Sequence, residues 1–167
     1  MSTPGPLARA RALLESLYRG IGELPNTALA FVARFSMAAV FWKSGQTKVE
    51  GFALDIVSGE FQWGWLRLSD NAVALFREEY KLPFLSPEMG AWLAATGEHV
   101  LPALLLLGLA TRLSALGLLG MTLVIQLLVY PGAYPTHGTW MAVLLYLMVH
   151  GPGQLSLDAW LYRNFHR

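Results

Sequence analysis

The chain of 167 residues lacks cysteine and is poor in charge. The absence of cysteine excludes disulfides, thiolate metal sites and thiol-based catalysis. Charged residues make up only 14% of the sequence, whereas typical soluble domains carry about 25%. The net charge of +1 creates no strong field of either sign, so we expect no nucleic-acid partner.

Familiar catalytic and cofactor motifs are missing as well. The sequence contains no Gly-rich phosphate loop, no fingerprint for NAD or FAD, no nucleophile elbow and no c-type haem motif. Glu98, His99 and His137 have side chains that can bind a metal, but they show no local ligand spacing and differ in expected depth. We therefore predict no metal site, and a haem between His99 and another histidine is a less favoured alternative.

Long apolar stretches are what the sequence does contain. Apolar and aromatic residues make up 54% of the chain, and the mean hydropathy is +0.43. A bilayer core of about 30 Å requires about 20 apolar residues in a helix. Four segments approach this length, namely residues 26–45, 87–111, 112–130 and 137–151. They predict an all-α fold, a bundle of four transmembrane helices; a soluble bundle with buried helices is the less favoured alternative.

The ends of these segments carry helix boundary signals. Ser86-Pro87-Glu88 combines an N-cap residue, a proline at the first helical position and an acid in the first turn. Tyr130-Pro131-Gly132 and Gly151-Pro152-Gly153 are helix stops. These signals support the second, third and fourth segments.

The distribution of Lys and Arg predicts the orientation in the membrane. Six arginines lie close to span ends on the side that holds both termini: Arg9, Arg11, Arg19, Arg112, Arg163 and Arg167. The other side, which comprises the loop of residues 46–86 and the start of the second segment with Glu88, has four basic residues and seven acids. The positive-inside rule therefore places both termini in the cytoplasm and this loop outside.

Three regions follow from this topology. Residues 1–25 form an N-terminal cytoplasmic amphipathic segment, which resembles a surface helix rather than a secretory signal. Residues 26–160 form the membrane domain, and residues 161–167 form a C-terminal cytoplasmic tail. We expect no cleaved leader.

The loop between the first two spans is too long to be a simple linker. Ser69 and Asp70 are candidate caps for a helix that places Val73, Phe76 and Tyr80 on one face. We predict an amphipathic periplasmic helix here, which lies on the membrane or covers the bundle. The conformation of residues 46–69 stays open.

Arg34 and Glu98 are charges in the middle of predicted spans. A charge at mid-span costs about 2.5–3.5 kcal/mol and normally finds a partner inside the protein. Counted from Pro25 and Pro87, at 1.5 Å per residue, the two residues lie about 13–14 Å and about 16–17 Å deep from opposite faces. They therefore reach one level, and we predict an ion pair between them. The pair has either a structural or a functional role.

Other polar residues extend this candidate site. His99 neighbours Glu98, and Pro102 removes the backbone hydrogen bond to the Glu98 carbonyl. An outward-facing polar cavity would hold seven residues: Arg34, Lys43, Glu98, His99, Gln126, His137 and Trp140. For Lys43 alone, a side chain that extends to the outer interface is the simpler interpretation.

These residues and motifs carry a resemblance that covers roughly residues 28–160. The sequence resembles the DoxX family of bacterial inner-membrane proteins in Arg34, Gly45, Lys48, Leu75–Pro83, Glu98, Pro102, Gly108–Arg112 and Gly151–Asp158. The resemblance implies a four-helix protein of the inner membrane. The family includes the membrane subunit of a thiosulfate:quinone oxidoreductase and a component of an oxidative-stress membrane complex, and it has no single established activity.

Two functions of different class follow. The first is a redox-linked accessory subunit that binds a quinone or a similar apolar ligand, at most as part of an oxidoreductase complex, with no catalytic residue assigned. The second is a scaffold, chaperone or transport component for a peptide or a metal complex, and proton-coupled transport is a third and weaker alternative. The expected partners are the lipid bilayer, a membrane or periplasmic protein and further copies of the chain.

Overall fold

The computed structural model describes residues 5–22, 25–54 and 58–165. Residues 1–4, 23–24 and 166–167, which belong to the predicted terminal segments, lie outside the described residues. The protein is mostly helical (75%), which agrees with the predicted fold class. Its α-helices are α1 (Pro6–Gly22), α2 (Asn26–Gln46), α3 (Asp70–Leu75), α4 (Pro87–Leu107), α5 (Thr111–Val124), α6 (Tyr134–His150) and α7 (Leu157–Phe165).

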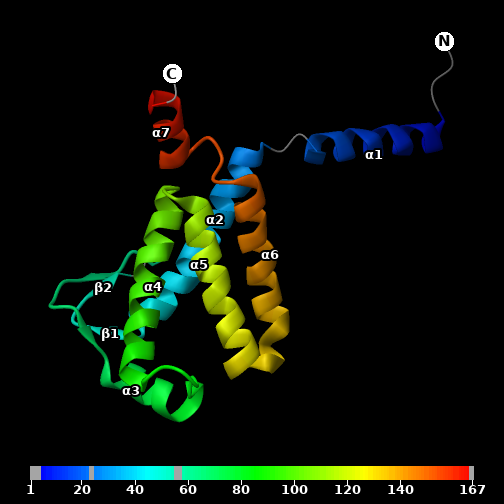
Figure 1. Cartoon of the computed structure of the whole chain (residues 1–167). Helices are drawn as coiled ribbons and strands as arrows, with labels where there is room; N and C mark the ends of the chain where they lie inside the picture. Colours follow the sequence, from blue (N-terminus) through cyan, green and yellow to red (C-terminus); the bar gives the residue numbers. More distant parts are fainter. Residues whose placement is uncertain (1–4, 23–24, 55–57, 166–167) are drawn as a thin grey trace.

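The helices α2, α4, α5 and α6 pack into a bundle (Figure 1). Its core is a continuous cluster of buried side chains, which includes Ala30, Met37, Phe41, Leu105, Ala115, Leu118, Leu144 and Leu147. Within the described residues, two helices are long and apolar enough to cross a membrane: α4, and α5 together with the π-helical turn η2 (Ile125–Val129) that continues it. The helix α1 extends away from the bundle (Figure 1).

The second predicted segment ends four residues earlier than expected. Gly108 adopts a left-handed conformation with φ +68°, and the amide of Leu109 donates to the carbonyl of Leu104 at 2.9 Å. This is the geometry of a glycine C-cap, which stops a helix and satisfies its last carbonyls. The turn between α4 and α5 is therefore residues 108–110 rather than Thr111-Arg112.

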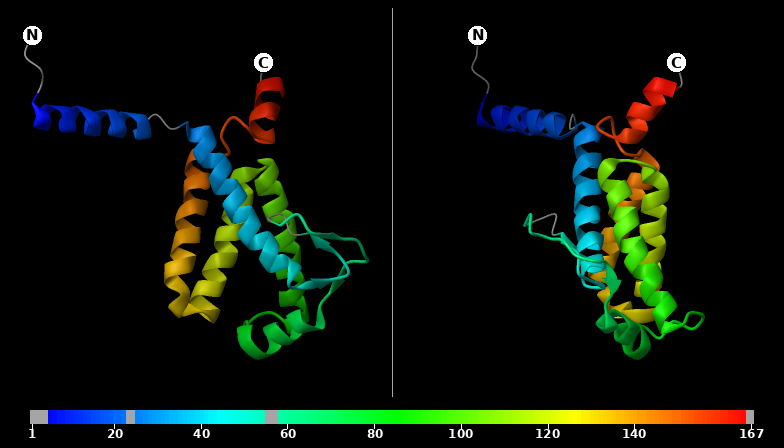
Figure 2. Two further views of the ribbon diagram at one scale, coloured as in Figure 1. Left: turned by 180° about the vertical axis from the view of Figure 1, so that it is seen from behind. Right: turned by 90° about the vertical axis from the view of Figure 1, so that its left-hand side faces the viewer.

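Helix α2 is displaced along the bundle relative to α4. Near its end, Gln46 bonds His99, which lies in the middle of α4, while Arg34 bonds the carbonyl of Leu106 at the last turn of α4. Figure 2 shows α2 running at a slant across its neighbours. Because of this displacement, the chain that follows α2 lies beside α4 rather than beyond its end.

The segment between α2 and α3, whose conformation the sequence left undetermined, contains two small antiparallel ladders among its described residues. β1 (Val49–Glu50) pairs with β4 (Arg67–Leu68), and β2 (Ala53–Leu54) pairs with β3 (Phe61–Gln62). The indole of Trp42 donates to the carbonyl of Leu54 at 2.5 Å, which fixes the β2–β3 hairpin against α2.

The predicted amphipathic segment is helical and has the expected cap and face. The hydroxyl of Ser69 accepts from the amide of Asn71 at 3.2 Å. Phe76 is buried, and Val73 and Tyr80 pack around it against α4. At Phe76 the helix changes from α3 to a π-helical turn, η1 (Phe76–Tyr80), which ends at Lys81 with φ +43°.

Candidate functional site

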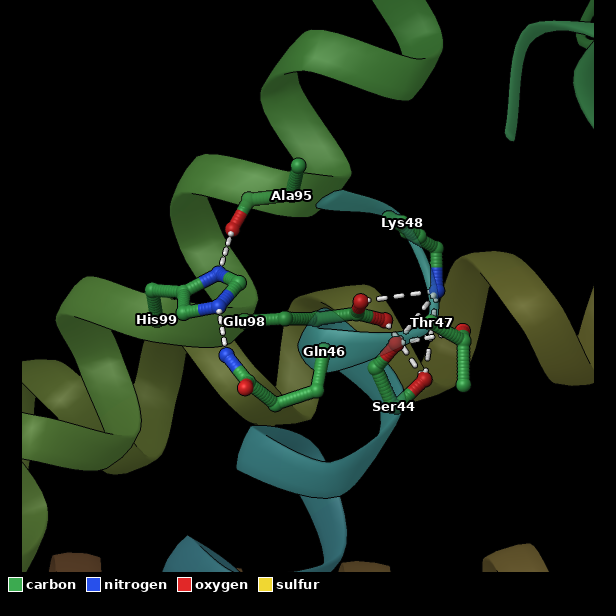
Figure 3. Close-up of polar contacts among 7 residues, drawn as sticks. All are labelled: Ser44, Gln46, Thr47, Lys48, Ala95, Glu98 and His99. Carbon is green, nitrogen blue, oxygen red and sulfur yellow. Dashed lines mark hydrogen bonds and ion pairs between the residues drawn. The ribbon is translucent and has the colours of Figure 1, made fainter. Parts of the chain in front are cut away.

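Glu98 lies at the centre of a buried polar cluster between the end of α2 and the middle of α4 (Figure 3). The ammonium of Lys48 is 2.7 Å from Glu98 Oε2, and the hydroxyl of Ser44 donates to Glu98 Oε1 at 3.1 Å. The side chains of Lys48 and Glu98 are only 4% and 3% exposed. The same ammonium donates to Ser44 Oγ at 3.2 Å. This Glu98 cluster therefore holds a fully desolvated ion pair with a shared hydroxyl.

The predicted ion pair between Arg34 and Glu98 is wrong. Ser44, not Arg34, faces Glu98, and the two α2 residues are ten positions, or about 15 Å, apart along a helix. The depth estimate treated α2 and α4 as level with each other, whereas α2 is displaced toward the Leu107 end of α4. The cation that meets Glu98 comes from Lys48, two residues beyond the end of α2.

His99 is held beside this cluster by both ring nitrogens. Its Nδ1 donates to the carbonyl of Ala95 at 2.7 Å, and its Nε2 lies 2.7 Å from Nε2 of Gln46, which is a donor. The carbonyl oxygen of the Gln46 side chain accepts from the amide of Leu54 at 2.6 Å. The ring of Trp42 packs edge-on against the imidazole at 5.0 Å. His99 thus joins α4 to α2 and to the hairpin.

Gly45 allows this close approach of the two helices. A Cβ atom built at Gly45 would lie 2.9 Å from the His99 ring and 3.0 Å from Glu98 Cβ. Contacts this short force a shift of the neighbouring side chains. Gly45 therefore has a packing role, and Lys48, three residues later, supplies the counter-charge to Glu98.

An apolar pocket of about 320 Å³ adjoins the carboxylate of Glu98. It lies between α4, the end of α5 and the α3–η1 segment. Among its lining residues Glu98 is the one charged group and Tyr80 the one hydroxyl; the others include Leu82, Leu85, Leu93, Ala94, Gly120, Met121, Val124 and Ile125. A buried polar group at the wall of an apolar cavity is typical of ligand sites. We call this cavity the Glu98 pocket.

Both π-helical turns border the Glu98 pocket. Phe76 and Tyr80 come from η1, and Ile125 comes from η2. The rings of Tyr80 and Tyr130 lie 5.9 Å apart, and the hydroxyl of Tyr130 donates to Glu79 in a short hydrogen bond. Single π-helical turns are rare and occur frequently at functional sites. The presence of two π-helical turns at its border therefore supports the Glu98 pocket as the candidate site.

The tyrosines at the ends of the two turns keep their protons at neutral pH. Burial raises the pKa of Tyr80, and the negative charges of Glu98 and Glu79 add to this effect. The hydrogen bond to Glu79, assisted by burial, raises the pKa of Tyr130 to about 12. Tyr80 is thus a stable hydrogen-bond donor at the pocket.

Arg34 forms a second buried cluster at the other end of the bundle. Its Nη1 donates to the carbonyl of Leu106 at 3.2 Å and its Nη2 to the carbonyl of Leu155 at 2.5 Å. The residue is 2% exposed. A Cβ at Gly108 would lie 2.2 Å from Arg34 Nη1, so only glycine fits there. This Arg34 cluster joins α2 to the end of α4 and to the chain that follows α6.

Asp158 completes the Arg34 end of the bundle. Its two carboxylate oxygens accept from the amides of Ala110 and Thr111 at 2.8 and 2.9 Å. These amides open α5, so Asp158 caps that helix from a distant part of the chain. Nothing local in the sequence indicates this role, because the cap is supplied from 47 residues away.

The remaining predicted site residues lie in other places. His137 Nδ1 donates to the side-chain oxygen of Gln126 at 2.8 Å, and the ring of Trp140 packs against His137 at 5.1 Å. The side-chain Nε2 of Gln126 donates to the carbonyl of Pro131 at 2.7 Å. Lys43 lines a separate cavity of about 450 Å³ between α2 and the hairpin. The predicted residues therefore occupy separate places instead of one cavity: Glu98 with His99, Gln126 with His137 and Trp140, and Arg34 and Lys43 each apart.

Sequence reasoning missed four residues in or beside the Glu98 cluster: Ser44, Gln46, Lys48 and Tyr80. Ser44 and Gln46 had no signal of their own, and Tyr80 was assigned only to an apolar face. Lys48 stood in a recognised pattern but was counted as a loop charge. Its spacing of three residues from Gly45 was the available clue, because Gly45 marks the closest approach of α2 to α4.

Comparison with known proteins gives one match. The DoxX family matches residues 29–131, which is more than half of the chain and includes both the Glu98 cluster and the Glu98 pocket. No curated protein matches the sequence. No solved structure matches it either.

Proposed function

Because the chain belongs to the DoxX family and is a small membrane protein, we propose that it crosses a bacterial inner membrane four times and binds a quinone in the Glu98 pocket. The spans are α2, α4, α5 with η2, and α6. Residues 26–160 form the membrane domain, both termini are cytoplasmic, and the α3–η1 segment is periplasmic.

Two further observations support the four spans. The helices α2 and α6 pack beside α4 and α5, the two helices that qualify by length and composition. Their outward faces are apolar and exposed, at 62% for Val32, 47% for Phe31 and 67% for Val149. Exposed apolar faces of this kind suit lipid.

The observation that carries the proposed ligand is the single carboxylate on the wall of an apolar pocket. Glu98 would not need to line a cavity if its role were only to pair with Lys48. A quinone requires an apolar cavity for its ring and tail and a few polar groups for its oxygens. Tyr80 can donate to a carbonyl of the oxidised form, and Glu98 can accept from a hydroxyl of the reduced form.

The proposed role is that of an accessory subunit. The chain has no cysteine, so thiol redox chemistry is excluded and a partner protein would exchange electrons with the ligand. In this role Lys48 and Ser44 hold the Glu98 carboxylate in place. The hydrogen bond between Tyr130 and Glu79 joins the α3–η1 segment to the end of η2 at the border of the pocket.

A photoreactive azido-quinone tests this proposal on the purified full-length chain. We expect the label on peptides of η1, α4 and the end of α5, and we expect decyl-ubiquinone to compete with it. In Gly120→Leu the label should be lost, because a side chain at residue 120 meets no atom within 4 Å and projects into the open pocket.

The matched control is Leu113→Phe on the same helix. Leu113 is 70% exposed and does not line the pocket, so this variant should label like the wild type. Equal labelling of the wild type and Gly120→Leu would refute the proposed site. Absence of labelling together with a stoichiometric bound polypeptide would favour the scaffold function instead.

A further inference from the structure

We propose that the cavity between α2 and the β2–β3 hairpin is a water-filled vestibule, which lies within the depth of the bilayer and opens to the outer aqueous phase. We call it the hairpin vestibule. It would hold water and small polar solutes. The inference goes beyond quinone binding, and it rests on the proposed topology, in which α4 crosses the membrane and the chain between α2 and α4 lies on the outer side.

The first observation concerns the depth of the hairpin. Gln46 bonds His99, which lies 12 residues after Pro87, or about 18 Å from that end of α4. Leu54 of the hairpin is bonded to both Trp42 and Gln46. The hairpin therefore lies beside the middle of α4, as Figure 1 also shows. Non-helical backbone therefore lies at the depth of the middle of α4.

The second consideration is what such backbone requires. At membrane depth, irregular chain is tolerated only where it is buried in protein or where it lines a water-filled cavity. The two ladders of the hairpin are short, and both Phe61 and Gln62 are exposed. Since none of the described residues covers the hairpin on that side, the remaining solution is water.

The lining of the cavity is also more polar than that of the Glu98 pocket. Four polar side chains line its volume of about 450 Å³: Lys43, Gln46, Glu60 and Gln62. Lys43 and Glu60 are both exposed, and neither forms an ion pair with another described residue. A charge in lipid costs about 2.5–3.5 kcal/mol, and this cost falls away when the charge lines an aqueous cavity. The Glu98 pocket, by contrast, has one charged residue in its wall.

The vestibule ends at the Glu98 cluster. Gln46 lines the vestibule and also bonds Nε2 of His99, the neighbour of Glu98 (Figure 3). Water in the vestibule is therefore separated from His99 by one side chain. The two cavities reach the cluster from different sides. The hairpin vestibule ends at Gln46, and the apolar Glu98 pocket ends at Glu98.

Cysteine accessibility tests the vestibule directly, because the natural chain has no cysteine. Gln62→Cys and Ala39→Cys place a thiol on the hairpin side and on the α2 side of the cavity. A thiol reacts with maleimide only as the thiolate, which forms in water and not in lipid. We expect both variants to be labelled by a membrane-impermeant sulfonated maleimide added to the outside of spheroplasts.

Two control variants define the extent of labelling expected for a lipid-facing thiol and for a water-exposed thiol. Leu113→Cys, on an exposed apolar position of α5, should remain unlabelled, and Asn71→Cys, exposed on α3, should be labelled fully. Gel filtration of each variant checks that it is folded. Labelling of both Gln62→Cys and Ala39→Cys supports the vestibule.

Three results would overturn it. These are protection of both thiols, labelling at Gln62→Cys alone, or cross-linking of two Gln62→Cys copies by a bismaleimide, which would mean that a second copy covers the hairpin. The maleimide assay contains no quinone. Its result is therefore independent of the azido-quinone labelling, so failure of the vestibule proposal can be distinguished from failure of the proposed quinone site.

Discussion

The two buried charge clusters of the bundle look alike by burial but differ in what they face. In the Glu98 cluster, an acid meets the ammonium of Lys48 and also lines an apolar pocket. In the Arg34 cluster, a cation bonds the carbonyls of Leu106 and Leu155 and lines neither the Glu98 pocket nor the hairpin vestibule. Burial of a charge is therefore common to both clusters, and the adjoining pocket is what makes Glu98 rather than Arg34 the candidate site.

The largest effect is expected from breaking the ion pair on one side. Lys48→Met leaves Glu98 buried without its counter-charge, which should lower the free energy of unfolding by about 3–5 kcal/mol. Unfolding in mixed detergent micelles measures this loss. The double variant Lys48→Met/Glu98→Gln should recover most of it, because no lone charge remains. If the double variant is as unstable as the single one, the ion pair is not the cause.

Arg34→Met should destabilise the protein by a smaller amount, about 2–3 kcal/mol, because it leaves the carbonyls of Leu106 and Leu155 without their charged donor. The same unfolding assay applies, with Arg34→Lys as the conservative control that keeps the charge. An Arg34→Met variant as stable as the wild type would show that the guanidinium does not hold this end of the bundle together.

Asp158→Ala should cost about 1 kcal/mol, the usual size of a lost N-cap. The carboxylate satisfies the amides of Ala110 and Thr111 at the start of α5. Asp158→Asn keeps one acceptor oxygen and should lose less. Hydrogen exchange of the first turn of α5 reports the effect locally; unchanged exchange in Asp158→Ala would show that the cap contributes nothing.

The smallest effect concerns pH at the edge of the Glu98 pocket. The pKa of Tyr130 is raised to about 12, so the contact of Tyr130 with Glu79 contributes fully below the ordinary value of about 10. Its contribution is lost as pH rises from about 10 to about 12. The tyrosinate absorbance difference between wild type and Tyr130→Phe should show this titration. In Glu79→Gln the pKa should fall toward its ordinary value, and an unchanged pKa would exclude the hydrogen bond as the cause.

The helical framework was predictable because its signals are local. Apolar stretches, the Ser86 cap and the glycine stop at Gly151 lie within a few residues of the boundaries they set. The π-helical turns were not predictable, since a single turn has no hydrophobic period of its own. The ladders of residues 47–69 were equally hidden, because strands of two residues show no alternation.

The candidate site was predictable only in part. Glu98 and His99 were identified because polar residues in an apolar span stand out. Their partners were missed because pairing depends on the displacement of α2 along α4, which no single segment encodes. Depth counting assumed two level helices and therefore matched Arg34 with Glu98 instead of Lys48 with Glu98.

The decisive measurement is the affinity of decyl-ubiquinone for two variants compared with the wild type. Glu98→Gln removes the carboxylate from the pocket, and Arg34→Lys changes the cluster that lines neither cavity. Competition against the azido-quinone should show at least about tenfold weaker binding in Glu98→Gln, equivalent to about 1.4 kcal/mol, and unchanged binding in Arg34→Lys. Equal affinity in all three proteins, or a loss confined to Arg34→Lys, would contradict quinone binding beside Glu98.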